Sequence, residues 1–139
     1  MTDTDRAWAW TALLLGIHQS EEVALSIAAW LSDVGTTGIG WFDEHIRTNP
    51  LAGTNPAARA GAVAGQGAAL WVVYRLTRDS RTLTRWVTSA LVLSWAAAFC
   101  MHLGMSARTR SFMPGTATSI IPGIPGAIWV LRRIRELTA

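Results

Sequence analysis

One stretch decides the fold: WAWTALLLGIHQSEEVALSIAAW, residues 8–30, where a long apolar run contains a histidine and two adjacent glutamates. A helix of about 20 residues is enough to cross about 30 Å of hydrocarbon. Residues three and four positions apart share one face of a helix, so His18, Glu21 and Glu22 point the same way. The stretch therefore predicts a membrane-spanning helix with an ionisable cluster near its middle.

The rest of the chain indicates the same fold class. Of its 139 residues, 50% are apolar and 15% are charged, whereas about a quarter are charged in a typical water-soluble domain. We expect one domain over residues 1–139, an all-α integral-membrane bundle of four helices. These are expected at about residues 7–31, 57–74, 86–107 and 115–131, the last one kinked by prolines.

The basic residues predict the orientation. All twelve are arginines, and with the N-terminus inside, eight of them fall on the cytoplasmic side. Those eight are Arg6, Arg75, Arg78, Arg81, Arg85, Arg132, Arg133 and Arg135. We therefore expect both termini to be cytoplasmic in a multi-pass protein of the plasma membrane, with membrane lipids and not nucleic acid as partners.

A second ionisable residue, His102, interrupts the apolar run LVLSWAAAFCMHLG at 91–104. Counted from the cytoplasmic ends of their helices, Glu22 and His102 lie at similar depth, so the two can meet. An ionisable group in the membrane costs roughly 3 kcal/mol or more on insertion scales, and a functional role is the default interpretation. The candidate catalytic residues are thus His18, Glu21, Glu22 and His102. A structural polar network between helices is the alternative.

A third polar segment is SFMPGTATS, residues 111–119. Pro114 and Gly115 break the chain where the last helix is expected to begin, and a helix N-terminus presents free N–H groups. With these groups, Thr116 and Thr118 would orient an acid of the cluster or a polar substrate head. The alternative is a plain capped turn.

Taken together, HQSEE at 18–22, His102, and FMPGTAT at 112–118 resemble the HXXEE domain family, small bacterial membrane proteins of undefined function. That family shows the motifs HxxEE, NxxxH and YxPGxxT. Here Ala98 replaces the asparagine and Phe112 replaces the tyrosine. The resemblance implies a bacterial inner-membrane location, and the two replacements imply a more apolar pocket.

The first functional hypothesis is an acid–base enzyme that acts on an apolar isoprenoid or lipid. Glu21 or Glu22 would start a cyclisation or isomerisation by protonating a double bond, as in a terpene cyclase, without a cofactor. Tryptophan faces stabilise carbocations. The expected substrate-binding residues are Trp10, Trp41, Trp95, Phe112, Thr116 and Thr118.

Two further hypotheses remain open. The second is a zinc- or iron-dependent membrane hydrolase or oxidase, with His18, Glu22 and His102 as ligands and His45 as a conceivable fourth. The third is a non-catalytic transporter or helix-partner subunit. Four helices are few for alternating access, so this third hypothesis would require a homo-oligomer.

Overall fold

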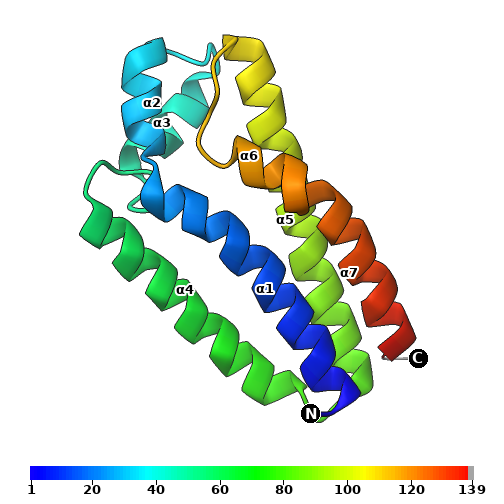
Figure 1. The fold of residues 1–139 in the computed structure, drawn as a ribbon. Helices are drawn as coiled ribbons and strands as arrows, with labels where there is room; N and C mark the ends of the chain where they lie inside the picture. The colour runs from blue at the N-terminus through cyan, green and yellow to red at the C-terminus, as the bar shows by residue number, and fades with distance from the viewer. Residues whose placement is uncertain (138–139) are drawn as a thin grey trace.

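The computed structural model describes residues 1–137, and every regular element in that range is a helix (Figure 1). The elements are α1 (Asp3–Ala24), α2 (Ile27–Val34), α3 (Gly40–Thr48), α4 (Pro56–Thr77), α5 (Arg81–Thr109), α6 (Thr116–Thr118), η1 (Ser119–Gly123) and α7 (Ile124–Leu137). The predicted all-α class is confirmed.

Three helices, α1, α5 and α7, pack against one another, and α4 lies along α1 at the edge (Figure 1). The N-terminus and the end of α7 lie at the same end of this bundle, and α2 and α3 lie at the other. The core between the three packed helices contains Leu14, Leu15, Val92, Phe99, Ala127, Val130 and Ile134. One long face of α1 therefore contacts both α5 and α7, and His18 lies on that face.

Helix α4 packs less than the sequence suggests. Gly61 and Gly65 are four residues apart, a small-residue spacing that allows close contact with a neighbouring helix. In the described part of the chain, no atom beyond the helix itself lies within 4 Å of a Cβ built at either glycine. The small-residue face of α4 is therefore on the outside of this single chain.

The first helix is not the continuous segment expected over residues 7–31. It begins earlier, at Asp3, and ends at Ala24, because Leu25 is extended and Ser26 caps a new helix through Ala29 N–H. The buried Arg59 guanidinium donates to the carbonyl of Val23 at 2.9 and 3.1 Å and to that of Gly53 at 2.7 Å. A cation at the negative end of a helix dipole stabilises this ending.

The end of the first expected helix and the residues after it form a helical pair, α2 and α3, although no helix was expected between residues 31 and 57. Its apolar face packs with Met113 next to the cluster-bearing end of α5. Asp43 accepts hydrogen bonds from the hydroxyls of Thr36 and Thr37, and Arg108 of α5 donates to the carbonyl of Thr37 at 2.7 Å. The pair thus covers one end of the bundle and is attached to α5.

The fourth expected helix, 115–131, is interrupted as its prolines predicted. A single turn, α6, leads into the wide turn η1, where Ile121 is extended, and the regular helix α7 starts only at Ile124. Pro122 lacks an N–H and cannot continue a helical hydrogen-bond ladder. The polar segment before the interruption is therefore free to turn its side chains toward α1 and α5.

Among residues 1–137, α5 is the helix that is long and apolar enough to cross a membrane. One such helix is weak evidence for membrane association, since a core helix of a water-soluble protein passes the same test. The four membrane spans expected from the sequence are not established by the fold alone.

The Asp43 contacts predict how the α2–α3 pair responds to pH. Hydrogen bonds from Thr36, and then from Thr37, lower the pKa of Asp43 below its ordinary value near 4. Their stabilisation is complete above that value and is lost as the pH falls through the lowered pKa. At neutral pH, Asp43→Asn should raise amide hydrogen exchange over residues 36–43 several-fold. Asp33→Asn, at an exposed position, is the control and should change little.

Candidate functional site

Two histidines and a glutamate from two helices meet in the interior. His18 and Glu22 lie one turn apart on α1, and Nε2 of His18 is 3.5 Å from Oε1 of Glu22. His102 of α5 approaches the same oxygen, with its Nε2 at 3.2 Å. His18 is 1% exposed and His102 2%, and Glu22 is also buried. This His18–Glu22–His102 cluster brings one potential ligand atom from each residue within 4.8 Å of the others.

Thr118 connects the other glutamate to the cluster. Its main-chain N–H and its hydroxyl both donate to Oε2 of Glu21, at 2.8 and 2.6 Å. The same hydroxyl oxygen is 2.9 Å from Nδ1 of His18. Because the hydroxyl proton goes to Glu21, His18 donates its Nδ1 proton to Thr118. Its other nitrogen, Nε2, then carries the lone pair that faces Glu22.

Gly115 brings the chain before α6 directly onto both histidines. It has a φ of +91°, and a Cβ built there would lie 2.6 Å from Nδ1 of His102 and 3.0 Å from Cε1 of His18. Only glycine adopts this backbone readily and leaves this space. Thr116 extends the attachment to α5 by its hydrogen bond to the Ser106 hydroxyl at 2.7 Å.

Two nitrogens of the cluster have unused bonding capacity. Nε2 of His18 and Nδ1 of His102 are buried and have no hydrogen-bond partner among residues 1–137. Most buried polar side-chain atoms have a partner, so each exception requires an explanation. For His18 the unpartnered atom is the one that faces the carboxylate of Glu22.

An aromatic wall closes the site on the α5 side. The rings of Phe99 and Trp95 lie edge-on to His18, with centroids 4.9 and 5.4 Å away. Trp95 was predicted from the sequence, whereas Phe99 was missed. The signal for Phe99 was its spacing, since it precedes His102 by three residues and so lies on the same helical face.

The geometry of the cluster would allow it to hold a metal ion. An ion about 2.1 Å from each ligand with tetrahedral angles holds its ligand atoms about 3.4 Å apart. The two measured separations, 3.2 and 3.5 Å, lie on either side of that distance. Two imidazoles and one carboxylate are ligands that suit zinc or iron.

The structure unites only part of the predicted site. His18, Glu21, Glu22, His102, Thr116 and Thr118 all take part in it or border it, as does Trp95. Three predicted substrate-binding residues do not. Trp41 is 73% exposed on α3, Phe112 is 65% exposed, and Trp10 packs on Trp129 at the surface of α1. His45 is exposed and contacts Asn49 within its own helix end.

The molecule is thus an all-helical protein with a buried His–Glu–His cluster held between two long helices. A family model described as "Protein of unknown function with HXXEE motif" matches residues 8–130, and the chain belongs to this family. Searches of curated proteins and of solved structures find no match.

The structure brings residues of the three family motifs into contact. His18 and Glu22 of the first motif face His102 of the second, and Glu21 of the first binds Thr118 of the third. The two positions that depart from the motifs are not cluster contacts in this structure: Ala98 is half-buried on α5 and Phe112 is exposed. The contacts among His18, Glu22 and His102 thus form here with alanine and phenylalanine at these two positions.

A substitution at Gly115 should disturb the cluster more than its small size suggests. Gly115→Ala adds a methyl group against both imidazoles at a positive φ, so we expect the free energy of unfolding to fall by about 1–3 kcal/mol. Unfolding in detergent measures this. The matched control is Gly104→Ala, at an exposed position of α5 with open space around it. Equal stability of the two variants would contradict the close approach.

Proposed function

We propose that this protein is a membrane-embedded, metal-dependent enzyme, a hydrolase or oxidase, that acts on a lipid-soluble substrate. The cluster of His18, Glu22 and His102 would hold one zinc or iron ion. The observation that carries the proposal is the spacing of these buried groups, with both histidine nitrogens at 3.2 to 3.5 Å from one carboxylate oxygen.

The contacts of Thr118 support the proposal. Metal-binding histidines nearly always donate their second ring N–H to an oxygen, and this contact orients the ring and fixes the tautomer. His18 makes such a contact to Thr118 at 2.9 Å, and Thr118 in turn binds Glu21, whereas the second nitrogen of His102, Nδ1, has no partner among residues 1–137. The lone pair of His18 Nε2 is thereby directed to the interior of the cluster.

Three protein ligands leave coordination positions open for water or substrate. A bound zinc or iron ion would supply Lewis acidity, and iron would also supply redox chemistry. The chain's own part is to hold the ligands, through Thr118 and Gly115, and to exclude water, through Phe99 and Trp95.

The acid–base reaction on an isoprenoid is the second candidate. It is favoured by the presence of two neighbouring carboxylates in an apolar interior, where one proton can be shared. It ranks second because Oε2 of Glu21 already accepts two hydrogen bonds from Thr118, and Glu22 faces two imidazoles. Neither carboxylate is placed as a free proton donor.

The proposal includes four membrane passes with both termini cytoplasmic. Only 17% of the most apolar part of α5 is buried within the chain, whereas the core helix of a water-soluble protein is mostly buried. Large apolar side chains are exposed along the bundle, among them Leu13, Ile17, Trp71, Val72, Leu93 and Ile128. Exposed large apolar side chains on α1, α4, α5 and α7 suit a lipid environment.

Metal analysis tests the proposal directly. The purified wild-type protein in nanodiscs, after exposure to zinc or iron(II) and desalting, should retain about one ion per chain. We expect metal binding to weaken by more than about 100-fold in each of His18→Ala, Glu22→Gln and His102→Ala. Loss of a residue that only hydrogen-bonds to a ligand typically costs about 10–100-fold, and loss of a ligand should cost more. His45→Ala is the histidine control. If wild type retains neither metal, the acid–base candidate takes precedence.

The orienting role of Thr118 gives a separate prediction. Thr118→Val keeps the shape of the side chain but removes the oxygen between His18 and Glu21. Metal affinity, measured by chelator competition, should fall by about tenfold while the stoichiometry remains one. Thr109→Val, whose hydroxyl bonds only the helix backbone at Met105, is the matched control. An unchanged affinity in Thr118→Val would show that Thr118 does not orient the ligand.

A further inference from the structure

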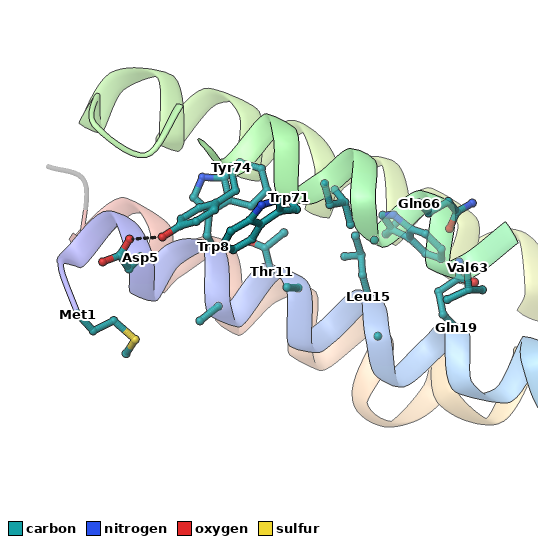
Figure 2. Close-up of a pocket in the computed structure, with 16 residues that line it drawn as sticks. Met1, Asp5, Trp8, Thr11, Leu15, Gln19, Val63, Gln66, Trp71 and Tyr74 are labelled. Carbon is teal, nitrogen blue, oxygen red and sulfur yellow. Dashed lines mark hydrogen bonds between the residues drawn. The ribbon is translucent and has the colours of Figure 1, made fainter. Parts of the chain in front are cut away.

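A long groove lies between α1 and α4 and is not part of the cluster itself (Figure 2). Its volume is about 550 Å³, and Trp8, Leu15, Gln19, Val63, Leu70 and Trp71 define it. At one end, Tyr74 donates a hydrogen bond to Asp5 at 2.8 Å. At the other end lie Gln19 and Gln66, with apolar walls between (Figure 2). We call it the α1–α4 groove.

Two polar atoms of the groove wall have no partner. Oε1 of Gln19 and the ring nitrogen Nε1 of Trp8 are buried, and neither has a hydrogen-bond partner in the described chain. Both residues are only 5% exposed. A buried polar atom without a partner typically costs about 1–3 kcal/mol. Both residues line the groove, so a rotation of the Gln19 side chain would bring its amide to the hydroxyl of a bound ligand.

The groove adjoins the cluster at its Gln19 end. Gln19 directly follows His18 in the chain, and Trp95, which lines the groove, lies 5.4 Å from the His18 ring. A polar head bound at Gln19 would therefore lie next to the cluster. The tail of the ligand could extend from Gln19 to Trp8. These residues are eleven positions apart on α1, which corresponds to about 16 Å of helix.

The charges around Gln19 restrict the kind of head group. Among the side chains that line the groove, the acid is Asp5, which is bonded to Tyr74 at the far end, so no charged lining side chain next to Gln19 favours a charged head. Glu21 is engaged by Thr118, and Glu22 by the two histidines, so no free carboxylate remains for a cationic head. An uncharged hydroxyl matches the amide of Gln19, since it both donates and accepts.

We propose that the α1–α4 groove binds one long-chain alcohol, of alkyl or prenyl type, with its hydroxyl at Gln19, and that this is the substrate class of the cluster. The inference rests on the proposed function. The groove volume lies within the range of about 300–1,000 Å³ found for small-molecule sites. Open space above Gly16 and Gly67 leaves room for the chain.

Photolabelling of the full chain in nanodiscs tests the inference. The probe is a long-chain alcohol with a diazirine in the middle of its chain, and labelled residues are mapped by mass spectrometry. Labels should concentrate in residues 8–19 and 63–74. Gly67→Leu fills the groove and should abolish this labelling. Gly61→Leu is the matched control, on the same helix but outside the groove, and should retain it.

Gln19→Leu tests the head group without filling the groove. Loss of one hydrogen bond should weaken binding of the alcohol by about three- to tenfold, measured by competition of unlabelled alcohol with the probe. Equal labelling of wild type and Gly67→Leu would overturn the groove as the binding site. Equal competition by a diacyl phospholipid would show an ordinary boundary lipid. An unchanged affinity in Gln19→Leu, or equal labelling by the matching fatty acid, would overturn the head-group assignment.

Metal content measured in the same samples separates this inference from the proposed function. Gly67→Leu and Gln19→Leu should retain the ion, while His18→Ala should lose it and keep the groove labelling. Groove labelling in a wild-type protein that retains no metal would contradict the metal-dependent function but leave the lipid site in place. Metal retention without specific labelling would overturn the groove and leave the metal site in place.

Discussion

The structure depends on one contact, in which a single carboxylate oxygen of Glu22 lies between the imidazoles of His18 and His102. In an apolar interior, none of these groups is stable alone, because burying a charged group without a partner costs several kcal/mol. The contact therefore requires α1 and α5 to meet at one depth. The aromatic rings of Phe99 and Trp95 then enclose His18 and keep water away.

The chain around this contact is shaped to hold it. Gly115 permits the backbone before α6 to lie directly on both histidines, and Thr118 then reaches Glu21 and His18 together. The last helix is interrupted at η1, directly after Thr118. The turn that carries Thr118 therefore does not have to follow the axis of α7. On the other side, Arg59 ends α1 shortly after Glu22 by binding the carbonyl of Val23.

Several boundaries could not be predicted from sequence. The apolar run of residues 7–31 reads as one helix because hydropathy does not register the break at Leu25. There Ser26 caps α2 locally through Ala29 N–H, and Arg59, 36 residues after Val23, binds the Val23 carbonyl at the end of α1. Likewise, Trp10, Trp41 and Phe112 were expected to contact substrate from their residue type. Trp10 and Trp41 lie on outward helix faces, which helix packing sets, and Phe112 is exposed in the loop between α5 and α6. Aromatic character alone does not tell a pocket wall from an outer face.

The sequence by itself determined the all-helical class, the common face of His18, Glu21 and Glu22, and the family, because helical periodicity and motif spacing are local properties. The sequence also placed Glu22 and His102 at a similar depth. Only the tertiary structure decided that both imidazoles approach one oxygen of Glu22, that Thr118 binds Glu21, and that a groove lined by Gln19 adjoins the cluster. These depend on the rotation of α1 against α5 and α4. Neighbouring glutamates differ by about 100° around a helix, so packing assigns them different partners.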